Sequence, residues 1–567
     1  MKIIVNKTVL IQLLIIFVFS FSMVLPNIVQ ARSILSYSSN SGPVGGGTIV
    51  NFETTVDGPI KQIDGDYNYS ALLTKDGDVY TWGSGGSGRL GNGTTDDVST
   101  PTLIDTSGAL AGKTVTKIAA GYRFMLALTD EGRVYSWGHN FSGQLGNGTN
   151  NQASSPVAVN TSGVLAGKTI VDIAAGGYSS VALASDGTVY TWGDNDLGQL
   201  GNGSSPSSNV PVAVYMGSNG LAGKTVTQVV AGFEHVMALT SDGNVYAWGS
   251  NYSGQIGDGS LLPTLYTPQA VDTGGVLAGK NIVRIAANDG DHSAAVSSDG
   301  LAYAWGANSY GELGNGSTSD SNTPVAVTNS GILAGKHVVD IAVGSGNTNA
   351  LTSDGNVYSW GMGGNGRLGN GSVVSSDVPV AVDMTGVLSG KQVSQIAIGR
   401  GTSLVVSSDG YAYGWGMNDE SQIGDGNASN SSLPVAVDIS SVPPSAISAA
   451  PTVLFGGALA SNVTMIDVDT FQATTPPGVA GSVDIEISFA DEDPILIAGG
   501  FTYIDDTTTD TDPDEDEEQG GVAGQTKDPQ RGLLADTGDN IGFIITTALV
   551  TVTAGIFVLK RRLFVQG

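Results

Sequence analysis

The sequence contains no cysteine, and charged residues make up only 13% of its 567 positions. Without cysteine the protein has no disulfide framework, no thiol nucleophile and no thiolate-bound metal. Positive charge is also scarce, because 23 Lys and Arg face 52 Asp and Glu, a formal net charge of −29. Such a surface repels phosphate backbones and anionic lipids, which argues against a nucleic-acid-binding protein. The 82 glycines favour a turn-rich β protein instead.

The N-terminal segment predicts export. Residues 1–31 combine Lys2 and Lys7 with an apolar run at 9–25 and end in small residues. This order is typical of a signal peptide, and we place the cleavage between Ala31 and Arg32. An uncleaved membrane anchor is the alternative, because the apolar run is nearly long enough to span a membrane.

The C-terminal segment, 533–567, predicts a membrane helix and a processing site. Residues 541–559 carry no charge and are followed at once by Lys-Arg-Arg, which predicts a transmembrane helix with a cytoplasmic basic stop. Just before the helix stands the motif Leu534, Ala535, Asp536, Thr537 and Gly538.

Motif, apolar span and basic tail in this order resemble a Gram-positive cell-wall sorting signal. The resemblance implies that a sortase cuts between Thr537 and Gly538 and joins the protein to peptidoglycan. Ala535 stands where proline is usual, as in the alanine-containing variant of the motif, so the class of sortase stays open. A plain single-pass membrane protein is the alternative.

Residues 506–532 predict a disordered, acidic stalk. Nine of the fourteen residues at 505–518 are Asp or Glu, and such a segment cannot bury a core. Asp510, Asp512, Asp514 and Asp516 alternate as calcium ligands sometimes do. The glycine and terminal glutamate of a calcium loop are missing at the right spacing, which favours a solvated stalk.

A repeat occupies the middle of the chain. All seven tryptophans precede a glycine and are spaced 55, 55, 56, 57, 55 and 55 residues apart: Trp82, Trp137, Trp192, Trp248, Trp305, Trp360 and Trp415. A fixed period means one supersecondary unit copied seven times. In each copy we expect four antiparallel strands, a two-residue hairpin turn at an acidic residue followed by glycine, and a proline that opens the last strand. The Tyr-x-Trp pair should fill the interface between neighbouring sheets.

Seven such units predict a seven-bladed β-propeller at 59–442. The Asp-Gly, Trp-Gly and Gly-Gln-Leu-Gly landmarks, as at 186–187, 192–193 and 198–201, resemble the regulator of chromosome condensation repeat, which implies the same ring. A solenoid or separate hairpins is the alternative. The founding member's guanine-nucleotide exchange and chromatin docking are not expected here, because this chain is exported and acidic and lacks a basic arm. Only His235 and His292 lie near the position where family repeats often carry histidine.

The segments that flank the repeats, 32–58 and 443–505, predict one interrupted domain. The first contains Gly-Pro-x-x-Gly-Gly-Thr at 42–48, and the second contains Phe-Gly-Gly at 455–457, Thr-Pro-Pro-Gly at 475–478 and Phe-x-Tyr at 501–503. Joined, they resemble an IPT/TIG domain, an immunoglobulin-like sandwich to which the first segment supplies one hairpin. Either segment alone would leave unpaired sheet edges. Two unrelated flanking segments are the alternative.

The predicted fold is therefore all-β, a seven-bladed β-propeller inserted into an immunoglobulin-like β-sandwich, with an N-terminal signal peptide and a C-terminal transmembrane helix. We expect the first and last strands of the propeller to meet in one blade, which brings residues near Pro59 and Val442 side by side. A long insertion in a sandwich loop is then tolerable, because its ends need not be pulled apart.

No catalytic constellation is visible in the sequence. The only mixed cluster of acids and imidazole is Asp289, Asp291 and His292, which could hold a metal, but no second histidine lies close by in the sequence. We therefore predict no catalytic residue, metal or cofactor, and no enzyme, and a surface hydrolase stays a third alternative.

Loops that vary between copies are the candidate ligand-binding sites, because a rigid ring presents them together. The candidates are Tyr122, Arg123, Phe124, Tyr178, Phe233 and Glu234 after the first strands, and Phe141, Tyr252 and Tyr310 after Trp-Gly. The alternative is that half of them plug the central channel or pack between blades.

These observations favour a binding or adhesion protein, exported to the surface of a bacterium with a Gram-positive-type envelope and anchored to its wall. Its partner would be an unknown extracellular protein or glycan, with no nucleic acid, and with membrane contact only through the C-terminal helix before sorting. The alternative is a secreted protein inhibitor of an extracellular enzyme, because a bacterial β-lactamase inhibitor has a similar seven-bladed ring and uses aromatic loops against its target.

Overall fold

The computed structural model describes residues 34–37, 41–54, 58–217, 220–443, 451–465, 470–488 and 495–504. In these ranges the chain forms β-strands and three short 3-10 turns, Gly86–Gly88, Gly163–Leu165 and Gly364–Gly366, and no α-helix. The described part also contains no helix that is long and apolar enough to cross a membrane. The predicted signal peptide, acidic stalk, sorting motif and helix at 541–559 lie outside the described residues.

Residues 58–443 form seven four-stranded antiparallel sheets, and each sheet uses four consecutive strands. Blades 1 to 4 are β4(Ile60–Asp66), β5(Tyr69–Thr74), β6(Val79–Gly83), β7(Val98–Leu103); β8(Val115–Gly121), β9(Phe124–Thr129), β10(Val134–Gly138), β11(Ala153–Ala158); β12(Ile170–Ala175), β13(Ser179–Ala184), β14(Val189–Gly193), β15(Ser208–Ala213); and β16(Val226–Ala231), β17(His235–Thr240), β18(Val245–Ser250), β19(Thr264–Ala270). Blades 5 to 7 are β20(Ile282–Ala286), β21(His292–Ser297), β22(Ala302–Gly306), β23(Ser321–Ala326); β24(Val338–Val343), β25(Asn347–Thr352), β26(Val357–Gly361), β27(Ser376–Ala381); and β28(Val393–Ile398), β29(Thr402–Ser407), β30(Ala412–Gly416), β31(Ser431–Ala436).

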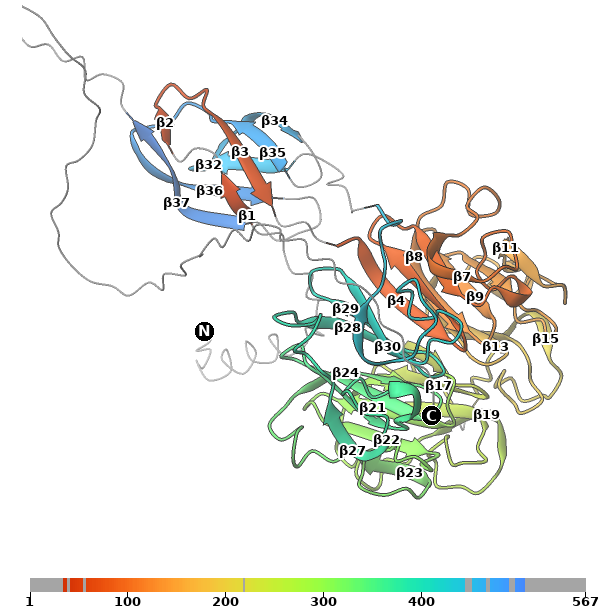
Figure 1. Ribbon diagram of the computed structural model, residues 1–567. Helices are drawn as coiled ribbons and strands as arrows, with labels where there is room; N and C mark the ends of the chain where they lie inside the picture. The colour runs from red at the N-terminus through yellow and green to blue at the C-terminus, as the bar shows by residue number, and fades with distance from the viewer. Residues whose placement is uncertain are drawn as a thin grey trace, which may run out of the picture. The chain divides into compact units, whose positions relative to one another are not determined.

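Neighbouring blades are joined by hydrophobic clusters, one cluster to each joint. The cluster that contains Ile60 and Trp82 of blade 1 also contains Leu404 of blade 7, so the last blade packs on the first. The seven sheets therefore close into a ring, which confirms the predicted propeller (Figure 1).

The Tyr-x-Trp pair fills these joints as predicted. Every tryptophan is fully buried, and each indole Nε1 donates a hydrogen bond of 2.8–3.0 Å to a backbone oxygen of the preceding blade. The donor and acceptor residues are Trp82 and Gln422, Trp137 and Arg89, Trp192 and Gln144, Trp248 and Gln199, Trp305 and Gln255, Trp360 and Glu312, and Trp415 and Arg367. The glycine two residues after each acceptor lies directly against the indole, which explains the Gly-Gln-Leu-Gly landmark.

The expectation that the first and last strands meet in one blade is wrong. β4 and β31 belong to different sheets, and the ring closes by packing one complete sheet against another. Its two ends still lie next to each other, since Ile60 and Val442 share a cluster and Ser441 Oγ donates to Pro101 O at 2.6 Å.

Two local predictions also need correction. The hairpin turn at Asp186 is longer than two residues, because Gly187 N donates to Ala184 O and only Gly187 has a positive φ. Proline does not open the last strand: Pro156 is the fourth residue of β11, where the register with β10 shifts. Because β11 is an edge strand and its register shifts at this point, the missing N–H of proline removes no hydrogen bond between the strands.

The segments on either side of the propeller form two further sheets. One has the order β1-β3-β35-β34 and the other the order β2-β37-β36-β32-β33. In Figure 1 the red strands from before the propeller lie among the blue strands from after it. The strands are β1(Ile34–Tyr37), β2(Ser41–Pro43), β3(Ile49–Thr54), β32(Thr452–Phe455), β33(Ala458–Leu459), β34(Ser461–Met465), β35(Thr470–Thr474), β36(Gly481–Ser488) and β37(Ile495–Ile504). Both sheets contribute to one core, where the rings of Phe52 and Phe471 stack with centroids 4.9 Å apart.

The motifs noted at 42–48, 475–478 and 501–503 contact one another. Gly47 N donates to Thr475 O at 2.9 Å, and Thr48 N donates to Thr475 Oγ1 at 3.0 Å. Tyr503 donates through its hydroxyl to Pro476 O at 2.7 Å. The first segment supplies more than a hairpin, because β1 and β3 pair in one sheet while β2 runs parallel to β37 in the other.

Candidate interaction face of the propeller

Two sets of loops meet at one end of the ring. In each blade the residue that follows the Trp-Gly pair donates a backbone hydrogen bond into the loop between the first two strands, as from His139 N to Arg123 O at 2.8 Å. We call this end the loop face. The opposite end, the turn face, carries the acidic hairpin turns, and six of these acids pair with a lysine that precedes the first strand: Lys113 with Glu131, Lys168 with Asp186, Lys224 with Asp242, Lys280 with Asp299, Lys336 with Asp354 and Lys391 with Asp409.

The structure separates the predicted ligand-binding residues into three groups. Phe141, Tyr252 and Tyr310 protrude from the loop face, with exposed fractions of 68%, 70% and 47%. Five others are partly exposed in the loops after the first strands: Tyr122, Arg123, Tyr178, Phe233 and Glu234. The prediction for Phe124 is wrong, because this residue begins β9 and its side chain is fully buried in the cluster between blades 2 and 3.

The partly exposed aromatic residues form one cluster. Tyr122 contacts Tyr67, Tyr178 and Phe233, with ring centroids 4.4, 5.2 and 5.6 Å apart. These four residues come from blades 1 to 4, so the cluster joins the loops of four blades. Tyr122, Tyr178 and Phe233 thus pack against one another, as the alternative expectation proposed. Phe141, Tyr252 and Tyr310 instead expose most or about half of their surface to solvent.

Arginine side chains surround Tyr67. The guanidinium of Arg400 lies 4.6 Å from the centroid of the Tyr67 ring, and that of Arg123 lies 5.4 Å from it and 4.9 Å from that of Tyr122. A hydrogen bond with Tyr122 and the charge of Arg400 lower the pKa of Tyr67. Arg89 and Arg367 belong to the same face and are only 4% and 8% exposed. In the described ranges, none of these four arginines forms an ion pair with a carboxylate, so the loop face carries a positive centre in an acidic protein.

The irregular fifth copy reaches across the mouth of the channel. The side-chain amide of Asn288, in the loop that precedes His292, donates to Ile398 O of blade 7 and, at 3.4 Å, to Gly65 O of blade 1. Below it lies a cavity of about 170 Å³ that is lined by residues of the first strands. The Asn-Asp-Gly-Asp-His irregularity therefore bridges the ring rather than forming a separate surface feature.

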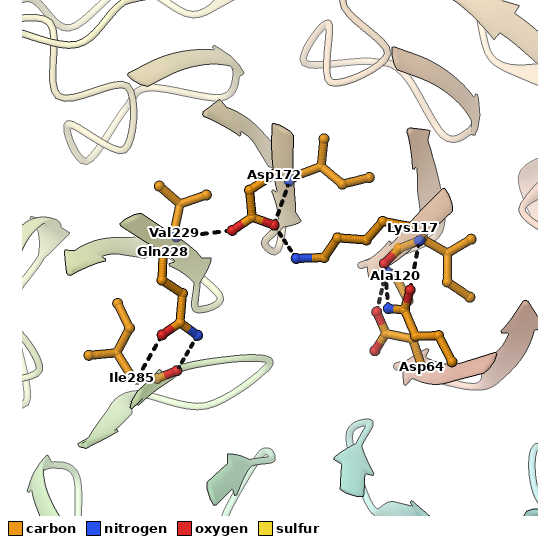
Figure 2. Close-up of polar contacts among 10 residues, drawn as sticks. Asp64, Lys117, Ala120, Asp172, Gln228, Val229 and Ile285 are labelled. Atoms are coloured by element: carbon orange, nitrogen blue, oxygen red, sulfur yellow. Dashed lines mark hydrogen bonds and ion pairs between the residues drawn. The ribbon is translucent and has the colours of Figure 1, made fainter. Parts of the chain in front are cut away.

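Polar side chains of the first strands connect neighbouring blades around the channel, and Figure 2 shows those of Lys117, Asp172 and Gln228. The third residue of the first strand reaches to the next blade: Lys117 forms an ion pair with Asp172, and Gln228 exchanges two hydrogen bonds of 3.1 Å with the backbone of Ile285. The seven residues are Gln62, Lys117, Asp172, Gln228, Arg284, Asp340 and Gln395. Two cations and two anions cancel, and most of the hydrogen-bonding groups are used between blades, so these side chains connect the blades and leave little for a ligand.

Three carboxyl groups lie near the channel mouth with raised pKa values. Burial raises the pKa of Asp64 to about 6 and that of Asp289 to about 7. Asp66 is 2% exposed, and burial together with the charge of Asp289 raises its pKa well above the usual range. Burial therefore disfavours the ionised form of these three side chains.

The predicted cluster of Asp289, Asp291 and His292 does not come together as a metal site. His292 is 1% exposed, and its Nε2 lies 2.8 Å from Thr348 Oγ1 of blade 6. His235 makes the equivalent contact with Ser293 Oγ of blade 5 at 2.9 Å. Burial lowers the pKa of His235 to about 4 and of His292 to about 3, so both stay neutral as contacts between blades. No group of three His, Asp or Glu within the described residues could hold a metal ion.

A hollow of about 410 Å³ lies beside Tyr252. Its lining combines the exposed side chains of Tyr252 and Leu261 with the polar residues Asn251, Asp320 and Asn322. The hollow occurs where the tryptophan spacing is longest, because the loop before β19 is one residue longer than its counterpart in blade 2. The face is therefore most irregular around blades 4 and 5.

Tyr67, Arg400, Arg89 and Arg367 are absent from the sequence-based candidates. The repeat itself contains the signal that identifies them. Tyr67 and Arg400 occupy the same loop position as Tyr122, and Arg89 and Arg367 replace the glutamine of the Gly-Gln-Leu-Gly landmark. An alignment of the copies shows the three arginines as cations at positions where other copies carry a neutral residue, and it shows Tyr67 as the blade 1 counterpart of Tyr122.

Family models match most of the propeller. Residues 107–458 match the RCC1-like domain, and residues 76–128 match the Regulator of chromosome condensation (RCC1) repeat. The chain belongs to the RCC1-like domain family. The RCC1-like region is 34% identical over 352 residues to the human E3 ubiquitin-protein ligase HERC2, which covers 62% of this chain but only 7% of HERC2.

Two further comparisons support the ring. The ultraviolet-B receptor UVR8 of Arabidopsis thaliana is 31% identical over 376 residues, covering 66% of this chain and 81% of UVR8. A structure of Kap60 bound to yeast RCC1 (Prp20) superposes with a TM-score of 0.54 at 22% identity, covering 73% of this chain and 90% of that one. The RCC1-like fold is thus common to proteins of very different activity.

Proposed function

We propose that the protein is an exported, wall-anchored surface protein whose RCC1-like propeller binds an extracellular protein or glycan through its loop face. The observation that carries this proposal is the exposure of Phe141, Tyr252 and Tyr310 at one end of a rigid ring. Large aromatic side chains that are held in place bind partners at a low entropic cost. RCC1-like propellers are interaction platforms in homologues, which fits this use of the face.

We assign the two-sheet unit to an immunoglobulin-like IPT/TIG domain. The contacts between Gly47, Thr48 and Thr475, and between Tyr503 and Pro476, support the assignment because they connect the motifs of that family. With the acidic segment at 506–532 this domain would act as a spacer between the propeller and the wall. The motif at 534–538 would supply the covalent anchor through a sortase.

We further propose that the protein is not an enzyme and does not exchange guanine nucleotides. His235 and His292 are buried in contacts between blades and stay neutral, so neither serves as a general base at the surface. The acids of the turn face are paired with lysines. The loop face offers aromatic rings and arginines, which suit binding.

Replacing Phe141, Tyr252 and Tyr310 together with alanine is expected to weaken partner binding at least tenfold and to leave the melting temperature almost unchanged. Exposed side chains contribute little to folding, whereas aromatic anchors dominate many interfaces. The measurement is binding of the labelled full chain to arrays of extracellular glycans and proteins. The matched control replaces Val276, Ile332 and Val387, which are 40–45% exposed beside the lysines of the turn face, with serine. Equal loss in both variants would contradict a binding site on the loop face.

Mass spectrometry of the C-terminal peptide, after muramidase digestion of the wall, tests the anchor. We expect a peptide that ends at Thr537 and carries a wall fragment. A peptide that retains Gly538 and the tail would rule out sorting. An unmodified end in the medium would favour the second candidate, a secreted inhibitor, which the protruding aromatic loops would also suit.

A further inference from the structure

We propose that Arg123 and Arg400, placed around Tyr67, bind a carboxylate group of an acidic protein segment. The inference rests on the proposed function, because it adds a charged subsite to the loop face, and it names an acidic protein as the partner. The subsite lies over blades 7, 1 and 2, and is distinct from the protruding rings of Tyr252 and Tyr310 in blades 4 and 5.

The two guanidinium groups converge on one aromatic ring. Both lie within 5.4 Å of the centroid of Tyr67, and they come from opposite neighbours of blade 1. A guanidinium that contacts an aromatic face through its own plane still presents its N–H donors at the edge. Two guanidinium groups next to one ring place several N–H donors on the same part of the loop face, where a planar anion can accept from them.

Three buried guanidinium nitrogens of the loop face lack hydrogen-bond partners. Arg123 Nε, Arg89 Nη1 and Arg367 Nε are buried without a hydrogen bond to any described residue. Arg89 and Arg367 are each more than nine-tenths buried. Burial and the charge of Arg123 lower the pKa of Arg89, and burial and the charge of Arg400 lower that of Arg367. An acceptor supplied by a ligand would relieve both the unpaired donors and the repulsion among the cations.

A carboxylate fits better than a phosphate. Asp66 and Asp289 lie close to the same arginines, and a dianion would be repelled by these two groups more than a monoanion. A phosphodiester polymer needs cations spaced along a track, whereas these converge on one ring. The neighbouring rings of Tyr122 and Tyr178 would contact the apolar parts of a peptide.

The test is calorimetric titration of the full chain with an end-blocked hexaglutamate peptide, with hexaglutamine as the uncharged comparison. We expect hexaglutamate alone to bind, and the R123Q/R400Q variant to bind it at least tenfold more weakly. The control is R133Q, because Arg133 is exposed on the turn face of blade 2 and should not matter. Melting curves establish that each variant is folded.

A second variant is expected to gain affinity. At pH 8, where Asp289 is ionised, D289N removes a competing negative charge next to Arg400 and Arg367, so it should bind hexaglutamate severalfold more tightly than the wild type. The proposal would be overturned if the wild type failed to bind hexaglutamate, if R133Q weakened binding as much as R123Q/R400Q, or if inorganic phosphate bound more tightly. If the chain does not bind hexaglutamate but still binds a partner from the glycan and protein arrays through Phe141, Tyr252 and Tyr310, the proposed carboxylate subsite is wrong and the proposed function stands.

Discussion

Replacing Gly201 with alanine is expected to lower the free energy of unfolding by about 3 kcal/mol. Gly201 has a φ of +57°, and a Cβ at this position would lie 2.6 Å from Nε1 of Trp248. The positive φ alone costs an alanine about 1–2 kcal/mol. The indole is fully buried and fixed by its hydrogen bond to Gln199 O, so displacing it adds about 1–3 kcal/mol of overpacking.

Gly203 provides the matched control for this variant. It also has a positive φ, +80°, but its Cβ would meet only Thr267 Cγ2 at 3.7 Å. G203A should therefore show the backbone cost without the collision. Denaturant unfolding of the full chain, followed by tryptophan fluorescence, measures both. Equal losses in the two variants would mean that the contact of glycine with the indole does not stabilise the joint between blades.

The D289N variant is expected to be more stable than the wild type by a few kcal/mol at pH 8 and equally stable at pH 4. Burial raises the pKa of Asp289 to about 7 in the folded protein, against an ordinary value of 3.8. Between these values the unfolded chain is ionised while the folded protein holds the proton, so stability falls as the pH rises from about 4 to 7. Asparagine cannot ionise and removes this loss.

Replacing Asp186 with asparagine is expected to change the stability in the opposite direction, and this variant serves as the control. The hydrogen bond of Asp186 to Lys168 lowers its pKa to about 2, so its contribution is present above pH 4 and is lost as the pH falls toward 2. D186N should therefore be slightly less stable than the wild type at pH 8. Thermal unfolding between pH 2 and 8 measures both variants. A D289N gain that is independent of pH would show that ionisation is not its cause.

The ring was predictable because its period and its joints are encoded locally. The spacing of Trp82 to Trp415 specifies seven copies, and the Tyr-x-Trp pair specifies the interface. The motifs at 42–48 and 475–478 likewise identified segments that contact each other across the inserted ring.

The site was less predictable, because it depends on contacts between copies. A single repeat does not reveal that Asn288 of blade 5 donates to blades 7 and 1, or that Arg400 and Arg123 share Tyr67. Phe124 was misassigned because the loop after β8 ends one residue earlier than the run of polar and aromatic residues suggests. The repeat pattern does not distinguish two ways of closing the ring. The first and last strands could pair in one blade, or the last complete sheet could pack against the first.

The chain leaves the two-sheet unit at Thr54 and returns to it at Pro451, so two peptide connections join that unit to the propeller. A pull between the two parts is shared by both connections. On the propeller, both begin at the seam between blades 7 and 1, where Gly58 N donates to Asp409 O and Ser441 Oγ to Pro101 O. A force applied to a bound ligand would therefore act on the contact between blades 7 and 1 through both connections at once. This contact is the part of the propeller that would carry the force.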